Sequence, residues 1–166
     1  MVTFLNLLTF FGEENMNEDK IKWCLKQNKG IVLIEPKPHL SKSYMKEADE
    51  TLENVFFTKG KWKLITAYYA CYNALYALFM KTGIKCEIHD CTLELMELFG
   101  FEPSEIDYLK KLKEDRIQVQ YYLKDIALKD EDAVKRFVFK SKILLNDLNS
   151  EKIETIREIA EKLMNW

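Results

Sequence analysis

Residues 61–81, KWKLITAYYACYNALYALFMK, decide the fold of this chain. Between Trp62 and Met80 the segment is apolar on every side of a helix, interrupted only by Lys63, Thr66 and Asn73. Small residues form one stripe along this helix and tyrosines form another, at spacings of three or four: Ala67, Ala70, Ala74 and Ala77, and Tyr68, Tyr72 and Tyr76. A helix without a polar face must be covered on all sides, so we expect a buried helix in a helical bundle.

Apolar residues recur at helical spacing through nearly all of the remaining sequence. The predicted helices cover residues 17–28, Ser41 or Ser43 to about Phe57, His89 or Asp90 to about Phe99, Pro103 through Arg116, Asp130 or Glu131 to about Leu148, and Asn149-Ser150 to the end. Residues 31–38 (IVLIEPKP) contain two prolines and have no visible strand partner, which favours an extended arm. We therefore predict an all-α protein, an up-down helical bundle with an extended N-terminal arm. Its parts are the arm and short helix (1–40), the bundle (41–149) and a C-terminal helix packed on the bundle (150–166).

The composition suits one domain with a sizeable core, since 48% of the 166 residues are hydrophobic. A net charge of −2 argues against a protein that coats nucleic acid, so any such contact must use a local patch. Residues 2–11 are apolar but too short to span a bilayer and lack the flanks of an export signal. Either Met16 is the start, or this arm docks on a groove or on a partner subunit. The tyrosines and Asn73 in residues 61–81 fit a protein core or subunit interface better than lipid, so we predict no membrane association.

The four cysteines, Cys24, Cys71, Cys86 and Cys91, show no disulfide framework in a chain of this size, which favours a reducing, cytoplasmic setting. Cys86, His89 and Cys91 lie within six residues and could supply three metal ligands. No second pair is visible to complete a zinc site, and small thiols at a helix start are the preferred interpretation. We predict no metal and no cofactor.

The sequence lacks a glycine-rich phosphate loop and the common hydrolase and metalloprotease motifs. A general base at His39 or His89 stays open, although a lone histidine is more often a cap or a surface group. Residues 109–129 carry six cations against three acids: Lys110, Lys111, Lys113, Arg116, Lys124 and Lys129 against Glu114, Asp115 and Asp125. With Tyr121 and Tyr122 nearby, this segment could neutralise phosphate and stack on unpaired bases. The alternative is a solvated helix face with ion pairs between successive turns.

Arg116 is one of three arginines in a chain whose other cations are lysines. An arginine suggests a site that needs a planar, bidentate donor for phosphate or carboxylate. The strongest alternative is a buried structural ion pair with Asp49 or another acidic residue.

Together, AYYACYNALYALF in residues 67–79 and Arg116 within DRIQVQYY resemble the HEPN family of small helical nucleotide-binding and RNase-toxin domains. The resemblance covers about residues 41–149 and includes SKSYMKEADETL. It implies a helical bundle in which a later helix carries an R-x₄₋₆-H motif. In active members two such motifs meet across a dimer interface and cleave RNA without metal, using the ribose 2′-hydroxyl. Here Tyr121, Tyr122 and Leu123 stand where that histidine would be, and Arg116-x₄-Tyr121 matches a tyrosine variant of the motif.

The resemblance implies roles for particular residues and partners. Arg116 and Tyr121 are the candidate catalytic residues, and Arg116, Tyr121, Tyr122, Lys113 and Lys124 are the candidate nucleotide or RNA contacts. Tyr121 could stack on a base, donate a hydrogen bond or accept a nucleotidyl group. We expect a homodimer, because the sequence holds more apolar surface than one small bundle needs. We also expect a toxin–antitoxin pair with a minimal nucleotidyltransferase and a degenerate RNase motif. The alternative is a non-catalytic dimeric module that binds a nucleotide or a protein.

Overall fold

The structure is a computed structural model, and it describes residues 17–165. The predictions for residues 2–11 and for a start at Met16 lie outside the described residues. In chain order the elements are α2 (Glu18–Lys26), β1 (Val32–Leu33), α3 (Pro38–Phe57), α4 (Gly60–Thr82), β2 (Ile84–Lys85), α5 (His89–Glu94), the 3-10 helix η1 (Met96–Phe99), α6 (Pro103–Tyr121), α7 (Glu131–Asp147) and α8 (Ser150–Met164). The prediction of an all-α fold is confirmed.

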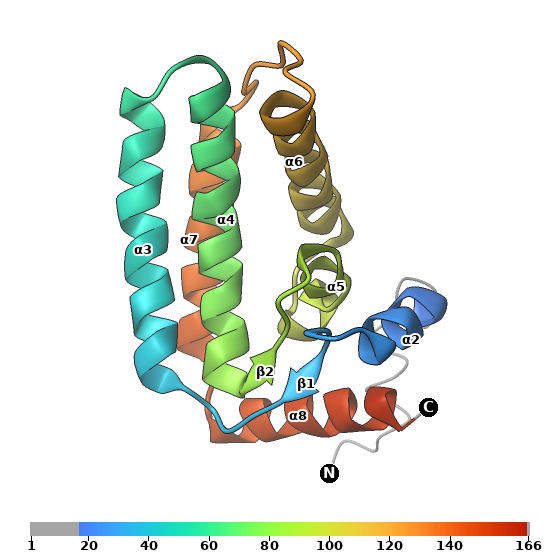
Figure 1. Ribbon diagram of the computed structural model, residues 1–166. Coiled ribbons are helices and arrows are strands. Elements are labelled where there is room, and N and C mark those ends of the chain that lie inside the picture. Colours follow the sequence, from blue (N-terminus) through green and yellow to red (C-terminus); the bar gives the residue numbers. More distant parts are fainter. Residues whose placement is uncertain (1–16, 166) are drawn as a thin grey trace.

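Helix α4 is the central element, and α3, α6 and α7 pack around it (Figure 1). Ala67, Ala70, Ala74 and Ala77 have no exposed surface, so the small stripe lets neighbouring helices approach closely. The predicted burial of this helix is therefore confirmed, and other helices of the same chain supply the cover. None of the helices in residues 17–165 is both long enough and apolar enough to cross a bilayer.

Helices α3 and α4 form an antiparallel hairpin, with Gly60 at a φ of +55° at the start of α4. The predicted start of α3 at Ser41 or Ser43 is wrong, because the helix begins at Pro38. Proline suits the first helical position, where its fixed φ is already helical and no N–H is needed for a helix bond. Ser41 is instead buried within the first turns of the helix.

Residues 31–38 do have a strand partner, so the prediction of an unpaired arm is wrong. Val32 and Leu33 of β1 pair antiparallel with Lys85 and Ile84 of β2. The partner strand follows Gly83, which has a φ of +73° and turns the chain out of α4. Each strand has two residues, which is too short to produce an alternating pattern in the sequence.

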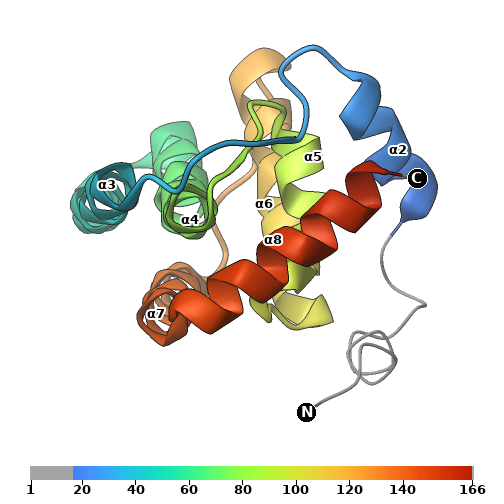
Figure 2. The same ribbon diagram turned by 90° about the horizontal axis from the view of Figure 1, so that it is seen from below.

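Helix α8 crosses the end of the bundle, running from α7 toward α2 (Figure 2). Asn149 caps it by accepting a hydrogen bond from the backbone of Lys152 at 2.9 Å, as the sequence predicts. Nη1 of Arg157 donates to the carbonyl oxygens of Ile34 and Thr82, both at 2.8 Å. The last helix is therefore bonded both to the segment after β1 and to the C-terminal end of α4.

A disulfide between Cys24 and Cys91 joins α2 to α5. The prediction that the cysteines do not pair is therefore wrong. The two cysteines are 67 residues apart in sequence, with Cα atoms 5.7 Å apart, and no local spacing marks such a pair. Cys71 and Cys86 are free thiols, and both are buried.

Candidate functional site

Arg116 lies on the buried face of α6. The helix begins with a capping box, in which the side chains of Glu102 and Glu105 each bond the other's backbone, and with Pro103 in its first turn. The buried residues of α6 are Leu109, Leu112, Arg116 and Val119. Because they recur at spacings of three and four, they form one face. Arg116, which is 7% exposed, therefore occupies a position that would ordinarily hold an apolar side chain.

The guanidinium of Arg116 packs against two tyrosines of α4. Its central carbon lies 4.8 Å from the ring centre of Tyr68 and 5.7 Å from that of Tyr69. Nη1 donates to Oε1 of Gln120 at 3.1 Å and to the hydroxyl of Tyr69 at 3.4 Å. Nε is buried and has no hydrogen-bond partner among the described residues. These neighbours are all uncharged.

The structure records no ion pair between Arg116 and any carboxylate of residues 17–165. Asp49, the acid proposed as its partner in a structural ion pair, instead bonds Lys142 at 2.5 Å. A buried cation without a nearby opposite charge costs free energy, because burial removes its hydration. Cation–π contact with Tyr68 offsets only part of that cost.

His89 lies beside the same tyrosines. Its Nδ1 and the hydroxyl of Tyr68 share a hydrogen bond of 2.6 Å, and its ring stacks on Tyr72 with centres 4.0 Å apart. Burial, together with the charges of Arg116 and Lys113, lowers the pKa of His89 to about 4. Burial raises the pKa of the Tyr68 phenol well above its ordinary value. Both side chains are therefore uncharged at neutral pH.

Two lysines add positive charge to this region. Burial lowers the pKa of Lys113, and the charges of Lys20 and Arg116 lower it further. Asp90 is the carboxylate bonded to the ammonium of Lys113. A groove of about 260 Å³ runs beside this pair, and its lining residues are Asp90, Leu93, Glu94, Lys110, Lys113, Glu114 and Ile117. Helices α2, α5 and α6 thus bring three cations, one neutral histidine and one acid together, and we call these five residues (Lys20, His89, Asp90, Lys113 and Arg116) the Arg116 cluster.

The other predicted site residues lie at the end of α6, away from the buried part. Tyr121 and Tyr122 are 65% and 67% exposed, and Lys124 is also exposed. The fifth residue along a helix lies about 140° around the axis, so Tyr121 points to a different side from Arg116. Gln120, the fourth residue along, takes the place beside the guanidinium. The structure therefore brings Arg116 and Lys113 together but records no contact between Arg116 and Tyr121.

Cys86, His89 and Cys91 do not form a metal-ligand set. Cys91 is bonded to Cys24, and Sγ of Cys86 donates to the carbonyl oxygen of Ile88 at 3.4 Å. The described part of the chain contains no group of three histidine, cysteine or acidic side chains arranged to hold a metal ion.

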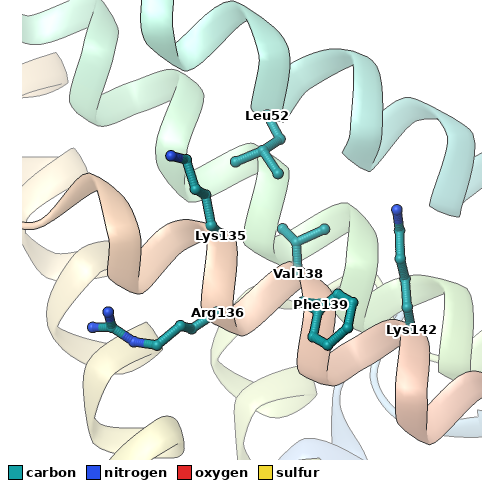
Figure 3. Close-up of a pocket in the computed structure, with 6 residues that line it drawn as sticks. All are labelled: Leu52, Lys135, Arg136, Val138, Phe139 and Lys142. Atoms are coloured by element: carbon teal, nitrogen blue, oxygen red, sulfur yellow. The ribbon is translucent and has the colours of Figure 1, made fainter.

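A second pocket, of about 360 Å³, lies between α3 and α7. Figure 3 shows Leu52 facing Val138, with Lys135 and Lys142 to either side. The cations on this face have acidic neighbours already, since Lys142 bonds Asp49 and Lys135 lies 3.3 Å from Asp132. This pocket therefore offers a less favourable place for an anion than the Arg116 cluster.

No family model matches the sequence, and no curated protein matches it well enough to count as a relative. The sequence indicated Arg116 and Lys113 as ligand contacts and left His89 open only as a general base or metal ligand, and it gave no signal for Lys20. The tyrosine stripe was the available signal for His89, because most buried hydroxyl groups have a hydrogen-bond partner, although the stripe does not identify that partner.

Proposed function

We propose that this chain is a HEPN-like protein that binds the phosphate groups of RNA or of a nucleotide at Arg116. The observation that carries the proposal is that Arg116 is only 7% exposed and has no carboxylate partner in residues 17–165. A bound phosphate would supply the missing negative charge. The planar guanidinium also matches phosphate geometry, which a lysine does not.

The neighbours of Arg116 support an anionic ligand. Lys20 and Lys113 add two positive charges, and Asp90 removes one. The exposed Tyr121, Tyr122 and Lys124 would contact the bases and backbone of a longer strand that leaves the buried part of the site. Nucleic acid is thus the ligand class that fits both the buried cations and the exposed aromatic end of α6.

The wider proposal follows the resemblance to HEPN domains. We infer a homodimer in the cytoplasm, paired with a minimal nucleotidyltransferase in a toxin–antitoxin system. With no histidine at Tyr121, Tyr122 or Leu123, we expect RNA binding without cleavage in EDTA. Disulfides such as Cys24–Cys91 are most common in oxidising compartments, so the redox state of these cysteines in cells tests the location. A small nucleotidyltransferase gene beside this one would support the pairing.

A second candidate function is a dimeric, non-catalytic module that binds a protein. The observation that favours it is the exposure of large apolar side chains where α3 meets α4. Phe57, the last residue of α3, is 83% exposed, and Trp62, in the first turn of α4, is 60% exposed. The end of the bundle where α3 meets α4 is also the end where α6 stops (Figure 1). Because α4 is covered by other helices of its own chain, it gives no reason to expect a dimer. The exposed apolar side chains at this end of the bundle are the remaining reason.

Replacing Arg116 with methionine should reduce affinity for single-stranded RNA by about 30-fold or more, because a buried charged contact is lost. Stability should stay equal or increase, since methionine fills a similar volume without a buried, unpaired charge. Lysine at this position should rescue little binding, because it lacks the fork of donors. Fluorescence anisotropy with labelled RNA measures the first effect, and thermal melting measures the second.

The matched control is Arg136→Met, which removes the same charge from an exposed position on α7. It should leave RNA affinity unchanged. Equal losses in both variants, or no RNA or nucleotide affinity in the wild type, would sink the proposal. A large drop in melting temperature for Arg116→Met would show a structural role instead.

Replacing Asp90 with asparagine should increase RNA affinity several-fold. In the free protein, the carboxylate of Asp90 forms an ion pair with Lys113 and repels an approaching phosphate. The gain should shrink as salt concentration rises, because screening weakens that repulsion. An anisotropy titration over a range of salt concentrations tests this, and unchanged or weaker RNA binding by Asp90→Asn would contradict the prediction.

A further inference from the structure

We propose that a phosphate group bound at Arg116 is also held by His89, which takes up a proton as the phosphate binds. This inference rests on the proposed function, because it requires an anion at Arg116. It adds a residue of α5 to the site and predicts how the site responds to pH.

The geometry places His89 and Arg116 around one tyrosine. The hydroxyl of Tyr68 bonds Nδ1 of His89 at 2.6 Å, and the guanidinium of Arg116 lies over the Tyr68 ring at 4.8 Å. Stacking on Tyr72 fixes the plane of the imidazole, with the two rings 14° from parallel. Within residues 17–165, Nε2 of His89 has no recorded hydrogen-bond partner. A protonated His89 would therefore have one N–H group to donate to a ligand.

The groups that face His89 come from two helices besides its own. Helix α4 contributes the phenols of Tyr68 and Tyr72, and burial keeps the pKa of both high, so they carry no charge. Helix α6 contributes Arg116 and Lys113, and Lys20 of α2 acts on Lys113 rather than on His89. Asp90, on α5 itself, neutralises one of these cations. The net field at His89 is positive.

A phosphate weakens this field. In the free protein, burial and the two α6 cations hold the pKa of His89 at about 4. A bound phosphate brings negative charge and an acceptor for N–H, and both favour the imidazolium form. The pKa of His89 is therefore higher in the complex than in the free protein, so binding takes up a proton.

The sign of the pH dependence follows from this linkage. Affinity rises as pH falls through the pKa of the complex, and it levels off below the lower pKa of the free protein. If the complex restores the ordinary histidine value of about 6.5, affinity should increase about tenfold between about pH 7.5 and about pH 5.5.

The test measures the affinity of the full chain, with its disulfide intact, for a short oligouridylate that lacks terminal phosphates. Neither uracil nor a phosphodiester titrates in this pH range, so the charge of the probe is constant. The wild type should show the tenfold rise, and His89→Gln should show a flattened profile. The matched control is His39→Gln, which removes the other histidine of the chain and should keep the full rise.

A second measurement does not depend on the folding of His89→Gln. In the His39→Gln protein, His89 gives the sole imidazole signals by NMR, and their titration midpoint should move upward when oligouridylate is added. An unchanged midpoint, or equal pH dependence in His89→Gln and wild type, would overturn the role of His89 while leaving RNA binding in place. Absence of binding by the wild type at every pH would instead overturn the proposed function, and this inference with it.

Discussion

Replacing Cys24 with serine should lower the free energy of unfolding by about 4 kcal/mol. The disulfide to Cys91 closes a loop between residues 67 apart in sequence, and it restricts the unfolded chain accordingly. The folded state should survive, because the core of the bundle lies around α4. Urea denaturation followed by circular dichroism, without reductant, measures the difference.

Reductant supplies the control for this prediction. The wild type with reductant should unfold like Cys24→Ser, and reductant should not affect Cys24→Ser itself. The double variant of Cys24 and Cys91 should resemble either single variant, since all three lack the same bond. Equal urea midpoints for the oxidised wild type and Cys24→Ser would contradict the prediction.

Replacing Gly83 with alanine should destabilise the fold by about 3 kcal/mol. A left-handed conformation costs a residue with a Cβ about 1 kcal/mol, and Gly83 has a φ of +73°. The added Cβ would also lie 2.4 Å from Nη1 of Arg157 and from the carbonyl oxygen of Ile34. Separating that charged hydrogen bond accounts for about 2 kcal/mol more.

Gly60→Ala is the matched control, and it isolates the contribution of crowding. Gly60 has a φ of +55°, but a Cβ there meets nothing within 4 Å. It should therefore show only the backbone cost of about 1 kcal/mol. Thermal and urea unfolding of both variants give the comparison. Equal losses would mean that the contact between Gly83 and Arg157 contributes little.

Much of the fold could be predicted from the sequence because its signals are local. The apolar surface of residues 61–81 predicted the buried helix α4, and Asp130 and Asn149 predicted the starts of α7 and α8. What could not be predicted depends on contacts between distant residues. The disulfide and the pairing of β1 with β2 both join segments that lie about fifty residues or more apart.

The candidate site could be predicted only in part. Arg116 stood out because its residue type is rare in this chain, and composition alone reveals that. The sequence does not reveal that Arg116 is buried, since a charged residue on a helix is ordinarily solvated. His89 was unremarkable as a lone histidine. Its contact with Tyr68 arises because the turn after α4 returns α5 to the side of that helix.

The hydrogen bonds of Arg157 also bear on how the protein assembles during synthesis. The guanidinium of Arg157 donates hydrogen bonds to the carbonyl oxygens of Ile34 and Thr82. The ribosome adds Arg157 more than seventy residues after either of these two residues. On the ribosome, α3 and α4 can pair as a hairpin as soon as both have emerged. The end of α4 stays open to water until α8 follows. Nascent chains that stop before Arg157 should therefore be cleaved by proteases near Gly83, and longer chains should resist.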